Sequence, residues 1–477
     1  MRTTTKHSNP SSSLDKGSML TALGIGFLWS WVYCAYNTPS LFHARTGNGS
    51  LAHPSWLVAI AGAILVLVVG AALFNKMRDP DKRLERLAAA LMAVGSLLLA
   101  TTAHPLLPMA GGFASGVGDG LLWLFWGRIL VGIHSERTEY IVPASSIVTV
   151  AASLVYPSLS GIAGAAAVAV LPLLSLACLA LVQQELSQAW GVAQEKDAPR
   201  PPMPTRDILY VIIYTVGVYF VIGCLNSLSP LSETAVGPFI VSVPVFLGSC
   251  LGVFLAMLCI LYAVRIDLSS LSKVIAPLLM GAIALFASRN VVADQLSIVL
   301  LAGADFMATS VTIVYLVSLE KSGRLKGYSG IGIAQGALLI GSAAGNSFGR
   351  QWHDSFNLSE GQLLLIVLVL ASVLILSLSF VPRGVLAPAS PSQPSPDQRE
   401  GDLTEIVQIL AAERGLTPRE TEILGYLARG RTEPYIREQL WLSRSTVSTH
   451  VKHIYQKLDI HSKQEIISLI EAKRECN

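Results

Sequence analysis

The chain has 477 residues, of which 52% are hydrophobic and only 14% are charged, and its mean hydropathy is +0.55. Soluble proteins of average composition are about a quarter charged, so this composition excludes a mainly soluble globular protein. The net charge of +3 is too small to indicate a partner by itself. We therefore predict an all-α membrane protein, in contact with the lipid bilayer, that carries a small soluble part.

Twelve apolar segments are each close to the roughly 20 residues that a membrane-spanning helix needs. None alternates with the period of two that a lipid-facing β-barrel requires. The segments lie at 19–37, 55–74, 87–104, 109–133, 141–157, 161–183, 208–225, 239–264, 274–288, 295–319, 331–349 and 361–381. The polar stretch 1–18 before them has no pattern of a cleavable signal peptide and is predicted to be a cytoplasmic tail.

The loops predict the orientation of these helices. With the N-terminus in the cytoplasm, the cytoplasmic segments before the C-terminal linker hold 19 lysines and arginines, from Arg2 to Arg383. The outer loops then hold only Arg45, Arg289 and Arg350. Positive charge favours the cytoplasmic side, so we predict a multi-pass protein of the bacterial inner membrane with both termini in the cytoplasm.

The helices divide into two halves. The proline-rich loop 184–207 separates helices one to six, 19–183, from helices seven to twelve, 208–381. Asp119 in helix four has a counterpart 186 residues later in Asp305 of helix ten, which indicates an internal repeat. This 6+6 architecture resembles the major facilitator superfamily over residues 19–381, but the family's loop motif is not cleanly present. The resemblance therefore implies a transporter-like fold without implying transport.

Asp119 and Asp305 are carboxylates within apolar spans, where a charge is costly and usually faces an interior cavity or a partner. One hypothesis is a site for a small-molecule ligand or a proton between the halves. The alternative is a structural hydrogen bond to a neighbouring helix. Glycines at four-residue spacing predict close helix packing rather than a moving seam. They are Gly112, Gly116 and Gly120 in helix four and Gly341, Gly345 and Gly349 in helix eleven.

We find no motif for catalysis, a cofactor or a metal. The sequence has no nucleophile elbow, P-loop or metal-binding motif, and its six cysteines show no ligand spacing, so we expect a protein that is not an enzyme. Residues 382–402 are rich in proline and serine and predict an extended or disordered linker.

Residues 403–477 predict a soluble domain, with a short leading helix at 403–414 and then four helices. Thr417 to Glu420 form a capping box with proline at the first helical position. Thr432 is expected to cap the second helix and Ser443 the third. A second capping box, Ser462 to Glu465, precedes a fourth helix whose expected buried residues are Ile466, Ile467 and Ile470.

The third of these helices carries the functional signal. Val447, Val451, Ile454 and Leu458 recur at the spacing of one helical face and predict its core side. The opposite side presents hydroxyls, a lysine and a glutamine, and no acidic residue lies between Glu438 and Asp459. Such a surface suits the major groove of DNA, whereas an ordinary solvated face is the alternative.

The segments LTPRE, RTEPYIREQLWLSRSTVSTHVKHIYQKL and HSKQE resemble the LuxR-type (GerE-like) DNA-binding domain over about 56 residues. The resemblance implies a four-helix domain that binds promoter DNA, commonly as a homodimer, with its third helix in the major groove. It assigns base-edge contacts to Ser448, Thr449 and Lys452, and phosphate contacts to Arg444, Ser445, Thr446, His453 and Lys457.

The second helix departs from the family pattern at Tyr435 and Arg437, where glutamate and alanine are usual. Loss of the cap partner should cost about 0.5–1 kcal/mol, and Arg437 must either open the helix packing or extend to solvent.

Three functions fit the whole chain. We favour a membrane-anchored transcriptional regulator whose transporter-like part senses a small molecule. The alternatives are an active secondary transporter with a DNA-binding regulatory tail, and a tail that only binds other proteins.

Overall fold

The computed structural model is helical, with connecting turns and no strand, over the residues that it describes. These residues are 16–36, 41, 52–74, 82–101, 104, 106–133, 135–159, 161–189, 202–228, 238–261, 274–288, 290–325, 329–356, 359–379, 396–429, 432–460, 465, 466 and 469. They divide into two compact units, residues 1–389 and residues 390–477. The predicted all-α class is confirmed.

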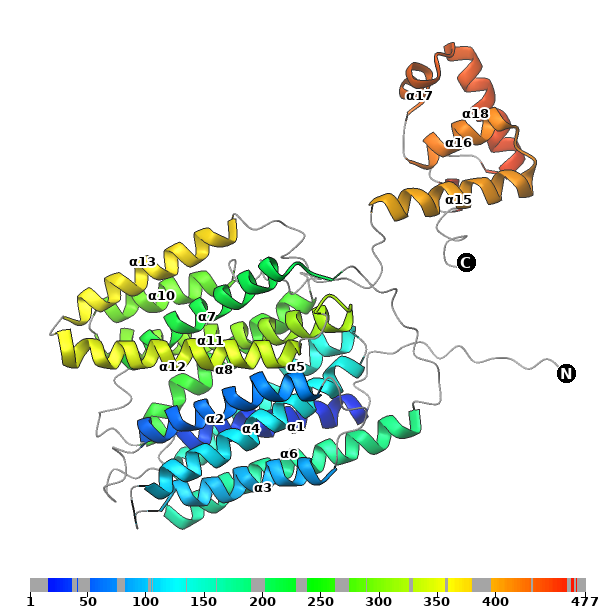
Figure 1. The fold of residues 1–477 in the computed structure, drawn as a ribbon. Helices are drawn as coiled ribbons and strands as arrows, with labels where there is room; N and C mark the ends of the chain where they lie inside the picture. The colour runs from blue at the N-terminus through cyan, green and yellow to red at the C-terminus, as the bar shows by residue number, and fades with distance from the viewer. Residues whose placement is uncertain are drawn as a thin grey trace. The chain divides into compact units, whose positions relative to one another are not determined.

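Twelve α-helices are described in the first unit, and each overlaps one of the predicted spans. Figure 1 shows α1, α2, α3, α4 and α6 as one group of neighbouring helices and α7, α10, α11, α12 and α13 as a second group, with α5 and α8 between them. Contacts between α2 and α12, and between α5 and α8, join the two groups. The helices are α1 (Lys16–Tyr36), α2 (Ala52–Phe74), α3 (Lys82–Leu99), α4 (Leu106–Gly132), α5 (Ser135–Val155), α6 (Gly161–Ala189), α7 (Thr205–Leu228), α8 (Pro238–Leu261), α10 (Ala276–Ala287), α11 (Val291–Lys321), α12 (Gly330–Phe356) and α13 (Glu360–Ser379).

Five stretches among the described residues are long and apolar enough to cross a membrane: Lys16–Tyr36, Arg137–Ser158, Gly161–Glu185, Thr205–Ser227 and Val291–Lys321. Shorter apolar stretches lie in α2, α8 and α10. Helix α4 contains several glycines and two charged residues, Asp119 and Arg128, and much of its surface is buried against neighbouring helices. A helix that is covered by protein needs less apolar surface than one that faces lipid.

The glycine rows bring helices into close contact, as predicted. A Cβ atom at Gly116 of α4 would overlap the carbonyl oxygen of Ala59 in α2, and one at Gly112 would overlap that of Ser55. In the second half, a Cβ atom at Gly345 of α12 would overlap the carbonyl oxygen of Phe220 in α7. Small residues thus allow backbone-to-backbone approach, which is how helices pack tightly inside a membrane.

The second unit contains α15 (Pro396–Arg414), α16 (Pro418–Ala428), α17 (Glu433–Leu440) and α18 (Arg444–Leu458). Its apolar side chains form a core of their own, separate from that of the first unit. Each fully buried leucine, isoleucine or valine contributes about 1.5–3 kcal/mol. The core comprises Ile406, Val407, Leu410, Ile423, Leu424, Leu427, Ile436, Val447, Val451, Ile454, Leu458, Ile460 and Ile466.

The two ends of this unit differ in how far the structure tests their predictions. Helix α15 begins at Pro396, seven residues before the expected leading helix and inside the segment 382–402 that we assigned to the linker. Proline is well tolerated in the first turn of a helix, so the Pro/Ser composition did not reveal the true start. Of the predicted fourth helix, Ile466 is buried as expected, whereas Ser462, Ile467 and Ile470 lie outside the described residues.

Candidate nucleic-acid interface

Helix α18 packs on the core through the face that its sequence predicts. Val447, Val451, Ile454 and Leu458 are all buried, and they share the core cluster with the apolar residues of α16. This packing fixes the rotation of α18 about its own axis. The opposite face is therefore held toward solvent.

The first turn of α18 is closed by a network of hydroxyl groups. Ser443 is the N-cap, and its side chain accepts a hydrogen bond from the backbone N–H of Thr446 at 3.2 Å. Its Oγ also lies 2.9 Å from Ser445 Oγ and 2.7 Å from Thr446 Oγ1. The predicted cap is confirmed. The amides at the start of a helix carry a partial positive charge, which favours a phosphate nearby.

The predicted DNA-binding side chains occupy the solvent-facing side of α18. Thr449 Oγ1 donates to the carbonyl oxygen of Ser445 at 2.8 Å, which holds its methyl group and remaining acceptor capacity outward. Thr446 and Lys457 are partly buried, and six of the predicted residues are exposed: Arg444, Ser445, Ser448, Thr449, Lys452 and His453. Their assignment to bases or phosphates stays a prediction.

A buried glutamate, Glu420, joins the start of α16 to the end of α18. The capping box is confirmed, because Glu420 Oε2 accepts hydrogen bonds from Thr417 N at 2.8 Å and Thr417 Oγ1 at 2.9 Å. Lys457 Nζ donates to the same oxygen at 2.8 Å and to the carbonyl oxygen of Gly415 at 3.0 Å. His453 Nδ1 lies 3.8 Å from Glu420 Oε1. The sequence revealed the cap but not the link from α16 to the last turn of α18.

These contacts determine the charge state of Glu420. Burial of the carboxyl acts to raise its pKa, but the hydrogen bonds from Lys457 and Thr417 outweigh burial and lower the pKa from 4.5 to about 2. Glu420 is therefore ionised at neutral pH and holds Lys457 in place. A phosphate contact by Lys457 would compete with this ion pair, so the structure gives Lys457 a structural role in addition to the predicted one.

Helix α17 shows the consequences of the two departures from the family pattern. Thr432 occupies the N-cap position, but its side chain makes no capping hydrogen bond, so the expectation that it caps α17 is wrong. Tyr435 stands where a glutamate would complete a capping box, and it packs instead against Tyr426 at 6.2 Å between ring centroids. Arg437 is exposed, so the larger side chain extends to solvent. Trp441 ends α17 in the left-handed conformation with φ of 54°.

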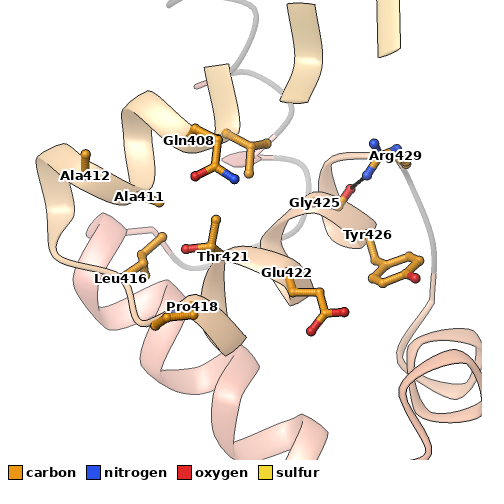
Figure 2. Close-up of a pocket in the computed structure, with 11 residues that line it drawn as sticks. Gln408, Ala411, Ala412, Leu416, Pro418, Thr421, Glu422, Gly425, Tyr426 and Arg429 are labelled. Carbon is orange, nitrogen blue, oxygen red and sulfur yellow. Dashed lines mark hydrogen bonds between the residues drawn. The ribbon is translucent and has the colours of Figure 1, made fainter. Parts of the chain in front are cut away.

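A groove of about 590 Å³ runs between α15 and α16 (Figure 2). Gln408 and Ala411 line it from α15, and Thr421 and Tyr426 line it from α16. Arg429 closes one end and donates to the carbonyl oxygen of Gly425 at 3.2 Å. None of the predicted DNA-binding residues lines this groove.

The membrane unit places each predicted carboxylate beside a tyrosine. Asp119 of α4 lies near Tyr36 of α1, and Asp305 of α11 lies near Tyr219 of α7. In both halves the pair joins the first helix, α1 or α7, to the fourth, α4 or α11, although the two tyrosines do not stand at matching positions along their helices. The sequence indicated the match between the carboxylates but not the tyrosines, which lie far away along the chain.

The two carboxylates differ in their remaining contacts. Asp119 is buried with Trp123 of its own helix nearby, and its Oδ1 has no hydrogen-bond partner among the described residues. Trp123 packs against Trp29 of α1 at 6.0 Å between ring centroids. Beside Asp305, the Tyr219 hydroxyl donates to Thr309 Oγ1 at 2.9 Å. No group of three or more metal-binding side chains occurs in the described part of the chain.

Comparison with known proteins identifies the C-terminal unit. Residues 414–470 match the family "Bacterial regulatory proteins, luxR family". This match and the geometry of α16 to α18 define the unit as a LuxR-type helix-turn-helix domain, a DNA-binding module of transcriptional regulators.

Individual relatives agree with this class. The unit is 44% identical over 66 residues to the "Uncharacterized response regulatory protein YgeK" of Escherichia coli (strain K12), which is 14% of this chain and 45% of that protein. It is 46% identical over 52 residues to the "Fimbriae Z protein" of Salmonella typhimurium (strain LT2), covering 11% and 25% of the two chains. It is 37% identical over 59 residues to the "Nitrate/nitrite response regulator protein NarL" of Escherichia coli (strain K12), covering 12% and 27%. The chain thus spans less than half of each of these relatives.

Two solved structures share the fold of the membrane unit. The proton:xylose symporter XylE of the major facilitator superfamily superposes with a TM-score of 0.54 at 13% identity, over 77% of this chain and 95% of that one. A bacterial homologue of the iron transporter ferroportin, in an outward-facing state, gives 0.51 at 16% identity, over 76% and 99%. The chain therefore combines a membrane unit of transporter-like fold, with stretches long and apolar enough to cross a membrane, and a LuxR-type DNA-binding domain.

Proposed function

We propose that this protein is a membrane-anchored transcriptional regulator whose transporter-like unit senses a small molecule and controls the C-terminal DNA-binding domain. The observation that carries the proposal is helix α18, which has an N-cap, contains no acidic residue and presents a polar side to solvent. The same chain carries the membrane unit. The protein would lie in the bacterial inner membrane with both termini in the cytoplasm, where promoter DNA is accessible.

On DNA, α18 would enter the major groove. Ser448, Thr449 and Lys452 lie near its middle and would read base edges, as hydroxyls and lysines commonly do. Arg444, Ser445 and Thr446 at its start, together with His453 and Lys457, would contact phosphates and set the register. Two copies would bind together as a homodimer on paired half-sites.

The sensing step would use the two Tyr–Asp pairs, one in each half. A small molecule at Asp119 and Asp305 would favour one arrangement of the two halves, since a ligand shifts a conformational equilibrium by its difference in affinity for the two states. Coupling of this kind typically amounts to about 1–3 kcal/mol. The changed membrane unit would then alter how readily two DNA-binding domains pair.

A direct test measures DNA binding by residues 390–477, which have their own core. The affinity should fall steeply with salt, because each phosphate contact releases counterions. Lys452→Ala should cost about 1–3 kcal/mol and relax the preferred sequence, whereas the matched change Arg414→Gln in α15 should have little effect. In a genome-wide map of DNA bound by the full chain, the sites occupied by the wild type should be lost in the Lys452→Ala variant. Absence of salt-dependent DNA binding by the fragment would disprove the proposal.

The second candidate, an active secondary transporter with a regulatory tail, is favoured by one observation: the unpartnered Oδ1 of the buried Asp119. Buried ionisable groups inside membranes commonly mark solute or proton pathways. Solute uptake into vesicles that is abolished by Asp119→Asn would support transport. Retained gene regulation without any flux would favour sensing.

A further inference from the structure

Trp441 is an exposed aromatic residue on the DNA-binding unit. Its relative exposure is 93%, the largest among the exposed large hydrophobic side chains of the described residues. The others all belong to the membrane unit, where lipid covers helix surfaces. Single exposed apolar residues are common on protein surfaces, but this one presents almost the whole indole, and tryptophan is favoured where an apolar ring meets a membrane surface.

The backbone at Trp441 offers no reason for a tryptophan. The residue ends α17 in the left-handed conformation, and its N–H donates to the carbonyl oxygen of Arg437. Glycine and asparagine usually occupy such C-terminal caps, because a bulky side chain is strained there. Neither the cap nor the core requires the indole, so we attribute it to an interaction with a partner.

The surroundings of Trp441 are basic. Arg437 precedes it in α17 and Arg444 follows it at the start of α18, and both side chains are exposed. Arg419 also donates to the carbonyl oxygen of Leu440, the residue before Trp441, and the nearest acidic residue along the chain is Glu438. An exposed tryptophan beside arginines is the combination that favours the headgroup layer of an anionic membrane.

The DNA-binding unit is tethered close to a membrane because the same chain carries the membrane unit. Sixteen residues, 380–395, connect α13 of the membrane unit to α15. Even fully extended, this number of residues spans at most about 55 Å. Tethering at this range gives a weak surface contact a high effective concentration.

We propose that Trp441, with Arg437 and Arg444, forms a docking surface for an anionic lipid bilayer. Arg444 is also a predicted DNA contact, so lipid and DNA compete for the same side of the unit. The inference rests on the proposed cytoplasmic placement of the DNA-binding unit. DNA is a poorer match for the indole than lipid, because phosphates reward charges and hydrogen-bond donors, and an indole has a single N–H on a large apolar surface.

The test uses residues 390–477, in which Trp441 is the only tryptophan. Its fluorescence should shift to shorter wavelength with vesicles of phosphatidylglycerol and phosphatidylcholine, and should not shift with phosphatidylcholine alone. In co-sedimentation, Trp441→Asn should lose most of the binding while keeping the left-handed cap. Arg437→Gln should weaken it roughly fivefold. Arg414→Gln is the matched control, because Arg414 adjoins Gly415 at the opposite end of α18, and it should weaken binding less.

The full chain tests the consequence. In nanodiscs, DNA should bind more weakly with anionic than with zwitterionic lipid, and Trp441→Asn should remove this difference. Equal vesicle binding by the wild type and Trp441→Asn would overturn the inference. So would a Trp441→Asn variant that loses DNA affinity in the absence of vesicles, since the indole would then be a DNA contact. DNA binding by the fragment without lipid tests the proposed function separately, so the two failures are distinguishable.

Discussion

The stability of the DNA-binding unit should depend strongly on the negative charge of Glu420. This carboxylate is 3% exposed and joins the start of α16 to the end of α18 through Thr417 and Lys457. A pKa lowered from 4.5 to about 2 corresponds to about 3 kcal/mol of stability at pH 7. Since the Lys457 side chain is 35% exposed and water screens the pair, we expect Glu420→Gln to cost about 2 kcal/mol.

The pH dependence has a defined sign. Because the folded pKa of Glu420 is lowered, its contribution is fully present above about pH 4.5 and is lost as the pH falls toward about 2. Urea unfolding of residues 390–477, followed by circular dichroism, should show the difference between wild type and Glu420→Gln shrinking across this range. Above pH 5 the difference should be constant.

Glu422→Gln is the matched control. Glu422 pairs with Arg419 on the exposed side of the same helix at 2.5 Å, where an ion pair contributes about 0–1 kcal/mol. Its removal should therefore change the stability little at any pH. The reasoning about Glu420 would be refuted if Glu420→Gln cost no more than Glu422→Gln, or if its cost were the same at pH 3 and pH 7.

Three further results are expected. Ser443→Ala should destabilise the 390–477 unit by about 1 kcal/mol through loss of the α18 cap, measured by urea unfolding, and an unchanged midpoint would contradict the cap. Trp441→Gly should stabilise the same unit by about 1 kcal/mol, because glycine adopts the left-handed conformation without strain. A loss of stability in the same assay would contradict the strain assigned to Trp441. Gly116→Leu should lower the thermal stability of the detergent-solubilised full chain, since its side chain would overlap α2, whereas Gly336→Leu in α12, with no atom within 4 Å of its Cβ position, should be milder.

The sequence predicted the DNA-binding unit well where the determinants are local. The stripe from Val447 to Leu458 and the caps at Thr417 and Ser443 depend on spacings of a few residues, and the structure confirms all of them. The contact between Glu420 and Lys457 joins residues 37 positions apart, and no local pattern indicates it. The Thr432 side chain makes no capping hydrogen bond, and Tyr435 supplies no acceptor for the second bond of a capping box.

The membrane unit shows the same division. Helix positions follow from hydrophobic length, and the glycine rows predicted tight packing because a missing side chain has one main structural use. Which helices meet at each row was not predictable, since a glycine does not specify its partner. The pairing of Tyr36 with Asp119 and of Tyr219 with Asp305 arises only when the first and fourth helices of each half are brought together.

The separate core of the DNA-binding unit limits how the membrane unit can control it. Sixteen residues separate α13 from α15 in the sequence, and the DNA-binding unit has its own core, so we propose that the membrane unit would regulate which partner the domain meets rather than the shape of α18. A domain that occupies lipid for about 99% of the time binds DNA about 100-fold more weakly. A ligand that brings two membrane units together would offset this penalty, because the two domains would then engage paired half-sites at high effective concentration. Under the proposals above, competition between lipid and DNA would then regulate access of the domain to its promoter.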